Sequence, residues 1–294
     1  MSKANSQHSA GLGPWGPQVG ASMPPGAAAA GRLTSGTRAA SAQGPAPTQW
    51  RVRIVVPGLP LQSCSVLLTD ARGQHILVDT GFPQHDSLLL DGLQRVGVKP
   101  AEIAGVINTH FHLDHFGGNF LFPDAWVYGS KVDFDWAVSI YESVCGGETR
   151  REVFRTFYPE ATDEEFDRMD EARVLQLLKW MWDPASLGAM ERYRWWEERE
   201  LGLAGIRALS TPGHTPGHLS LEVNGVEGPY LIVGDARPFA DDGVAGYDMP
   251  PHNHQLFQHS RRHIDRFVGI LVPGHDDPFS QSREEVALEA RKQP

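Results

Sequence analysis

Cysteine is scarce in this chain of 294 residues, which contains only Cys64 and Cys145. Two cysteines cannot build a disulfide framework, and neither lies near a histidine or a second cysteine at a spacing typical of a metal site. Each is therefore better explained as a small buried apolar residue than as a metal ligand. The low cysteine content is typical of a reducing compartment, and we expect a cytoplasmic protein.

Long apolar runs and an excess of basic residues are also missing. The most apolar stretches, such as Gly105–Ile107 and Tyr230–Val233, are far shorter than the roughly 20 residues of a membrane-spanning helix. Lys and Arg number 26 against 36 Asp and Glu, which gives a formal net charge of −10. Proteins that bind nucleic acids gather Lys and Arg instead. We therefore expect a small-molecule substrate, with neither a nucleic acid nor a membrane as partner.

Acidic residues are absent from residues 1–48, where Gly, Ala, Pro and Ser dominate. Such a segment cannot bury enough apolar surface to fold, so we predict a disordered tail. Its composition is weakly similar to that of an organelle transit peptide, but it lacks the continuous apolar region of a secretory signal. We favour a disordered extension and assign residues 49–294 to a single folded domain.

Short β-branched runs begin directly after this tail. Three of them, Arg51–Val56, Cys64–Thr69 and His75–Asp79, follow one another closely, which predicts an antiparallel start. Apolar residues at helical spacing predict a helix over Ser87–Val96, and a further strand is expected over Ile103–Thr109.

The middle of the chain changes in character. Residues from about 131 to 203 predict amphipathic helices, including one that starts at Thr162 with Glu165 as a capping box. Later segments restore the first pattern: strands are expected over Ile206–Ser210, Leu219–Val223, Tyr230–Val233 and Gly269–Val272, with a helix near Leu256–Phe267. Two strand-rich halves, each followed by helices and separated by a helical insertion, predict an α/β layered domain.

A dense group of polar residues follows the strand at Ile103–Thr109. His110, His112, Asp114 and His115 place three imidazoles and one carboxylate within six residues, which packing alone does not explain. Alternate residues of an extended chain point the same way, so His110 and His112 can share one metal ion. The following turn then presents Asp114 and His115 as a second pair.

Two metal ions of this kind need six or seven ligands, more than this group supplies. Three later residues follow closely after a predicted strand: His214 in Thr211-Pro-Gly-His, Asp235 in Val233-Gly-Asp and His275 in Val272-Pro-Gly-His. The other histidines of the domain are interpreted as satisfied or surface residues: His75, His85, His218, His252, His254, His259 and His263. His252 and His254 lie in a Pro-containing loop, and nothing in the sequence requires them to line the site.

These motifs, with Leu77-Val-Asp-Thr-Gly81 ahead of them, resemble the metallo-β-lactamase superfamily over roughly Trp50–Phe279. The resemblance implies a four-layer αβ/βα sandwich with the site at one edge of the paired sheets. It also implies a complete ligand set, in which the first metal is bound by His110, His112 and His214, the second by Asp114, His115 and His275, and both by Asp235. Asp79 would orient ligands by hydrogen bonds.

The resemblance implies a dinuclear metal-dependent hydrolase. Two zinc ions are expected, although manganese, iron and cobalt also occupy sites of His and Asp. A metal-bound hydroxide would attack a carbonyl or phosphoryl group while the metals stabilise the oxyanion. Asp114, besides binding metal, would act as the catalytic residue that holds the proton or passes it to the leaving group.

Class B β-lactamases of this superfamily carry a cysteine at the position of Asp235, so the aspartate argues against antibiotic hydrolysis. The motif spacing suits both acyl-homoserine-lactone lactonases and hydroxyacylglutathione hydrolases of the glyoxalase II type. The position of the insertion and the pair His275-Asp276 favour a lactonase-like ester hydrolase. One departure stands against it: lactonases of this type have a tyrosine shortly after the bridging aspartate, whereas here only Tyr247 could take that place, if its loop folds back.

The insertion is rich in aromatic residues, which are Trp136, Tyr141, Phe154, Phe157, Tyr158, Trp180, Trp182, Tyr193, Trp195 and Trp196. They would form an acyl pocket, the face of a homodimer or the core of the insertion itself, and the sequence leaves all three open. An alternative from another class is an iron-dependent oxidoreductase similar to the persulfide dioxygenases, which bind one iron with two histidines and an aspartate. The second set of ligands disfavours it.

Overall fold

Runs of β-branched and aliphatic residues form the first of two β-sheets. In the computed structural model its strands pair in chain order: β1 (Arg51–Val56), β2 (Ser65–Thr69), β3 (His75–Val78), β4 (Ile103–Ile107), β5 (Trp126–Gly129) and β6 (Tyr193–Trp195). β1, β2 and β3 are antiparallel, as predicted, and β3 to β6 are parallel. The structure describes residues 48–146, 155, 157–168, 176, 179, 182–183, 187–241 and 250–290.

The second sheet has the order β11-β10-β9-β8-β7. Its strands are β7 (Ile206–Ser210), β8 (Leu219–Gly225), β9 (Gly228–Gly234), β10 (Gly269–Pro273) and β11 (Phe279–Gln281). β7, β8 and β9 are antiparallel, β10 is parallel to β9, and β11 is antiparallel to β10. The strand predicted to be the last, at Gly269–Val272, is therefore followed by one more.

The alternation of side chains along the strands creates separate apolar layers. On β2 and β3, Leu67 and Leu77 pack with helices α1 (Asp86–Arg95) and α3 (Lys131–Cys145), whereas Leu68 and Ile76 face the second sheet. On β9, Ile232 joins the layer between the sheets. Its neighbours Leu231 and Val233 pack on the other side, where Ile264 of helix α7 (His254–Ile264) covers them.

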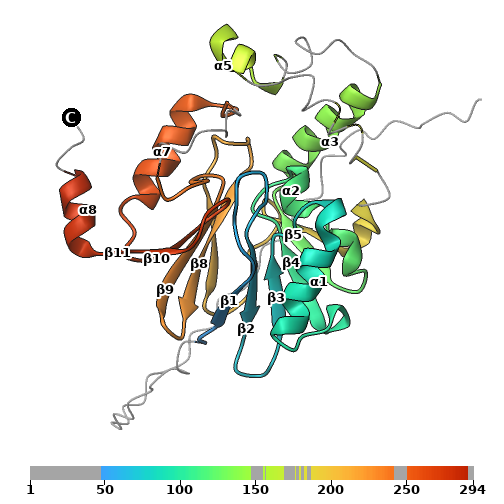
Figure 1. Cartoon of the computed structure of the whole chain (residues 1–294), viewed down its shortest axis with the longest axis vertical. Coiled ribbons are helices and arrows are strands. Elements are labelled where there is room, and N and C mark those ends of the chain that lie inside the picture. The colour runs from blue at the N-terminus through green and yellow to red at the C-terminus, as the bar shows by residue number, and fades with distance from the viewer. Residues whose placement is uncertain are drawn as a thin grey trace, which may run out of the picture. The chain divides into compact units, whose positions relative to one another are not determined.

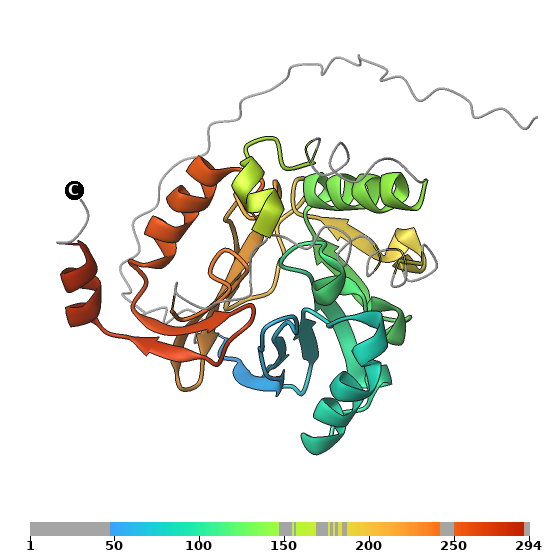
Figure 2. The same cartoon turned by 45° about the horizontal axis from the view of Figure 1, so that its top comes forward.

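The result is a four-layer αβ/βα sandwich, which confirms the predicted fold class. Figures 1 and 2 both show α1 and α3 on one side of the paired sheets and α7 on the opposite side. The other α-helices with described bounds are α2 (Leu113–Phe116), α5 (Asp163–Arg168) and α8 (Arg283–Ala290), and short 3₁₀ helices lie at Pro83–His85, Pro100–Glu102, Asn119–Leu121 and Met190–Arg192.

The predicted insertion agrees with the structure in part. The capping box is present, because the Glu165 carboxylate accepts from the Thr162 amide at 2.7 Å and the Thr162 hydroxyl accepts from the Glu165 amide at 3.2 Å. Tyr193–Trp195 forms strand β6, where helix was expected, because its backbone pairs with β5. Most of 169–181, the tail at 1–47, Phe154 and Tyr247 lie outside the described residues.

Two smaller predictions can be compared with the structure. Cys64 is buried, as expected, but Cys145 is exposed, because it ends α3 on the side away from the core. Among the described residues, no helix has the length and apolar character needed to cross a membrane.

Gly92 in α1 provides a test of the contact between this helix and the first sheet. A Cβ atom at Gly92 would overlap the backbone carbonyl of Val55 on β1. Gly92→Ala is expected to lower the free energy of unfolding by about 1–3 kcal/mol, because the overlap outweighs the gain in helix propensity of about 1 kcal/mol. Denaturant unfolding would measure it, with Gln94→Ala on the exposed face of α1 as control. Equal stability of both variants would refute the close packing.

Candidate metal centre

All seven predicted ligand residues lie where strands of the two sheets end. His110 and His112 follow β4, and Asp114 and His115 belong to the short helix α2 that comes next. His214 lies in the loop between β7 and β8, Asp235 follows β9 and His275 follows β10. Because the two sheets pack face to face, these strand ends meet at one edge, and the structure brings the seven side chains together in two groups.

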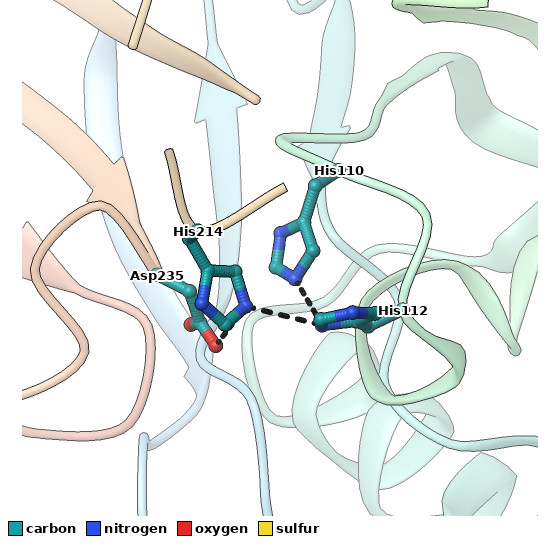
Figure 3. Close-up of side chains that lie close together, drawn as sticks. All are labelled: His110, His112, His214 and Asp235. Carbon is teal, nitrogen blue, oxygen red and sulfur yellow. Dashed lines mark hydrogen bonds and ion pairs between the residues drawn. The ribbon is translucent and has the colours of Figure 1, made fainter. Parts of the chain in front are cut away.

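The first group consists of His110, His112, His214 and Asp235, whose nearest ligand atoms all lie within 4.8 Å of one another. Figure 3 shows the four side chains pointing toward a common centre. His112 Nδ1 is 3.1 Å from His110 Nε2 and 3.1 Å from His214 Nε2. His214 Nε2 lies 3.3 Å from Asp235 Oδ2.

The second group consists of Asp114, His115 and His275. Asp114 Oδ2 is 3.4 Å from His275 Nε2 and 3.7 Å from His115 Nε2. Two imidazoles and one carboxylate are a common set of protein ligands for a catalytic zinc ion.

Asp235 lies between the two groups. Its Oδ1 is 3.3 Å from His115 Nε2, and its Oδ2 is 3.3 Å from both His214 Nε2 and His275 Nε2. The backbone amide of Asp235 donates to His218 Nε2 at 3.2 Å. His218, interpreted from the sequence as a satisfied or surface histidine, is thus a satisfied buried one that supports Asp235.

Asp79 orients two of the histidines. Its carboxylate accepts from the Thr109 amide at 2.8 Å, from the Thr109 hydroxyl at 2.7 Å and from His115 Nδ1 at 2.8 Å. Because the Thr109 hydroxyl already donates to Asp79, its contact of 3.1 Å with His110 Nδ1 is one in which the histidine donates. In the neutral form of each imidazole the lone pair is therefore on Nε2, the atom that faces the other ligands.

His275 is oriented in the same way as His115. His275 Nδ1 lies 3.1 Å from the carbonyl oxygen of Leu59, which can only accept, so His275 also carries its lone pair on Nε2. His115 Nε2 is buried and makes no hydrogen bond among the described residues, while it faces the carboxylates of Asp114 and Asp235. Histidines that bind metals are held in this way, with the second ring nitrogen donating to a carboxylate or a backbone carbonyl.

The histidines of the two groups differ in the direction in which their pKa values are shifted. Burial lowers the pKa of His110 and His214 well below the ordinary value and that of His112 to about 4. Burial acts in the same direction on His115 and His275, but the carboxylates of Asp235 and Asp114 outweigh it and raise both pKa values. The three histidines of the first group are thus uncharged at pH 7, which is the form that binds metal. The carboxylates around His115 and His275 favour positive charge, which a divalent cation also supplies.

Aromatic residues of the insertion lie beside the first group. The Tyr158 hydroxyl is 3.4 Å from His112 Nε2, and the Trp136 ring centroid is 5.7 Å from that of His112. Trp136 also packs against His252, whose Nδ1 lies 2.7 Å from the carbonyl oxygen of Phe157. The sequence showed an aromatic-rich segment but could not show which of its members reach the site.

Comparison with known proteins identifies relatives of this chain. The family model described as the metallo-beta-lactamase superfamily matches residues 58–275. The metallo-beta-lactamase domain-containing protein 1 of Rattus norvegicus is 28% identical over 223 residues, which cover 74% of this chain and 68% of the relative. An N-acyl homoserine lactonase of Agrobacterium fabrum is 27% identical over 217 residues, which cover 71% of this chain and 72% of the lactonase.

Solved structures show the same fold. One is an N-acyl homoserine lactone hydrolase with the product N-hexanoyl-L-homoserine bound at its catalytic metal center. It is 19% identical to this chain, with a TM-score of 0.51, and the match covers 78% of this chain and 94% of that one. Another is a dizinc quorum-quenching lactonase, 17% identical with a TM-score of 0.51 and coverage of 75% of each chain.

Replacement of Asp79 tests its orienting role. Asp79 has a left-handed backbone with φ of 53°, which asparagine tolerates, so Asp79→Asn preserves shape while an amide replaces the charged acceptor for His115. We expect metal affinity to fall by about 10- to 100-fold. Elemental analysis after dialysis against a graded series of chelator concentrations would measure it. Asp91→Asn, on the exposed face of α1, is the control, and equal metal retention in both variants would exclude the role.

Proposed function

This chain belongs to the metallo-β-lactamase superfamily, and from that premise we propose that it is a hydrolase with two metal ions that cleaves a lactone or another carboxylic ester. The observation that carries the proposal is the position of Asp235, whose oxygens lie 3.3 Å from histidine nitrogens of both ligand groups. A carboxylate in this position would link two cations, which is the arrangement of a two-metal hydrolytic site.

The donor set suits zinc. His110, His112 and His214 would hold the first ion and Asp114, His115 and His275 the second, with Asp235 between them. Imidazole nitrogen and carboxylate oxygen are ligands that zinc accepts, and manganese, iron and cobalt accept them too. When bound, such ions lower the pKa of a water molecule and stabilise negative charge on a carbonyl oxygen.

Asp114 is the group best placed to move a proton. Its side chain is 17% exposed, whereas those of His115, His275 and Asp235 are at most 1% exposed. It is therefore the most accessible side chain of these four, while its Oδ2 stays 3.4 Å from His275 Nε2. We assign to Asp114 the transfer of a proton to the leaving alcohol.

Two observations favour an ester or a lactone among the substrates of this superfamily. The residue between the ligand groups is an aspartate and not the cysteine of class B β-lactamases. A thioesterase would need a basic residue near the last motif to bind a glutathione carboxylate, and Arg237 is the candidate among the described residues. In this structure it is paired with Asp265 at 2.9 Å and donates to the Ala240 carbonyl.

Tyr158 is our candidate for the tyrosine that is missing after Asp235. It comes from the insertion, is buried, and places its hydroxyl 3.4 Å from His112 Nε2 at the edge of the first group. A phenol in this position can donate a hydrogen bond to a substrate carbonyl. We therefore infer that Tyr158 takes the role that lactonases give to a residue of a different loop.

A substrate panel tests the proposed function. The metal content of the protein as purified would be measured, and the protein as purified and after loading with zinc would be assayed with acyl lactones, glutathione thioesters, phosphodiesters and persulfides. We expect two zinc ions for each chain and the highest kcat/KM with a lactone or ester. Faster cleavage of glutathione thioesters would support the glyoxalase II alternative. A single bound iron with oxygen consumption on persulfides would support the dioxygenase, and inactivity on every substrate would refute hydrolysis.

Asp114→Asn tests the proton transfer. The amide keeps the shape of the carboxylate but cannot take up a proton, so we expect kcat to fall by about 10²- to 10⁴-fold. Metal content measured on the same samples separates this effect from a lost ligand. Asp124→Asn, at an exposed position before β5, is the control. Unchanged kcat in the Asp114 variant would remove Asp114 from the mechanism.

Tyr158→Phe tests the substitute tyrosine. Removal of the hydroxyl is expected to lower kcat/KM for a lactone by about 10-fold, the effect of one hydrogen bond to a polarised carbonyl, while the zinc content stays at the wild-type level. The matched control is Tyr193→Phe, because the Tyr193 hydroxyl donates to the carbonyl of Leu187 at 3.0 Å. If both variants retain wild-type kcat/KM, another residue contacts the substrate.

A further inference from the structure

Asp133 is a buried carboxylate that belongs to neither ligand group. It lies in the first turn of α3, with its side chain inaccessible to solvent, and its amide donates to the Ser130 hydroxyl at the start of the helix. A buried carboxylate is costly unless its oxygens accept hydrogen bonds. The two oxygens of Asp133 accept from backbone amides of two distant loops.

Each of these loops carries ligands of the first group. Asp133 Oδ2 accepts from the amide of Phe111 at 2.7 Å, and Phe111 stands between His110 and His112. Asp133 Oδ1 accepts from the amide of Gly217 at 3.0 Å, three residues beyond His214. One carboxylate thus joins two loops that lie about 100 residues apart in the sequence, and it does so one residue away from His112.

Other contacts hold the same two loops against α3. The Tyr141 hydroxyl, two turns further along the helix, donates to the carbonyl oxygen of Phe111 at 2.7 Å. The helix therefore binds both the amide and the carbonyl of Phe111. On the other loop, a Cβ atom at Gly217 would overlap the Ser130 hydroxyl, so this loop packs directly on the start of α3.

We propose that Asp133 is a positioning residue that sets the spacing between His112 and His214 and so selectively raises the affinity of the first metal site. This inference rests on the proposed two-metal function. The selectivity follows from the contacts, because the backbone amides that Asp133 binds both belong to loops of the first group. The second group is held elsewhere, by Asp79 on His115 and by the Leu59 carbonyl on His275.

Titration of the metal-free protein with Zn²⁺, in competition with a chromophoric chelator, would resolve two dissociation constants. His214→Gln and His275→Gln assign one constant to each site. In Asp133→Asn, an NH₂ group replaces one carboxylate oxygen and faces the backbone amide of either Phe111 or Gly217. Two donors cannot form a hydrogen bond, so the loop that contains this amide is released. We expect the first constant to rise about 10- to 100-fold and the second to change less than about threefold.

The exposed Asp135, on the same helix, gives the matched control Asp135→Asn. Tyr141→Phe is a milder second variant that keeps Asp133 and should weaken the first site by about threefold to tenfold. If Asp133→Asn folds poorly, Tyr141→Phe still tests whether the contacts between α3 and the Phe111 loop affect the first site. The absorption of bound Co²⁺ is an independent readout of the first site, whose ligand geometry should change in the Asp133 variant.

Three outcomes would overturn the inference. Wild-type constants in Asp133→Asn, even with a lower Tm, would leave Asp133 a purely structural residue. Equal weakening of both sites would show a general effect on the fold. Failure of the wild-type protein to bind two ions would refute the proposed function itself, which distinguishes that failure from the other two.

Discussion

The apolar layer between the two sheets is the contact on which the site depends. Ile76 and Ile107 of the first sheet and Leu221 and Ile232 of the second are buried in the same layer. Because this layer fixes one sheet against the other, the ends of β4, β9 and β10 meet at one edge. Asp114 and His275, which are separated by 161 residues of chain, then lie 3.4 Å apart, although no single loop contains a complete set of ligands.

Much of the fold is readable from the sequence, since β-branched runs gave β1 and β7 with the bounds that the structure shows. The strands β5, β6 and β11 were missed, because they have only three or four residues and, unlike β3, contain no run of β-branched and aliphatic residues. The ligand motifs named seven residues that the structure brings together. Asp133 was missed because an aspartate in a first helical turn is typical of a helix start. The backbone amides of Phe111 and Gly217, which its carboxylate binds, come close to it only in the folded structure.

The directions of the hydrogen bonds prepare the site before any cation binds. Carboxylate, hydroxyl and carbonyl acceptors fix which ring nitrogen carries the proton in His110, His115 and His275. Little rearrangement is then required on binding, which is the physical meaning of preorganisation. The two groups still differ, because a cation at the second group competes with protons for His115 and His275, whereas burial already keeps the three histidines of the first group uncharged.

Through strand β6, the insertion also forms part of the first sheet. β6 is the last strand of this sheet, and the Trp196 amide continues the contact by donating to the Gly129 carbonyl at 2.9 Å. Arg192, just before β6, ties the same region down by donating to the carbonyls of Phe122 and Asn119. Without this segment, β5 would expose a row of unpaired backbone groups, the kind of edge that recruits other chains into aggregates. The insertion that brings Tyr158 beside His112 therefore also ends the first sheet with an edge strand of only three residues, which offers few backbone groups to another chain.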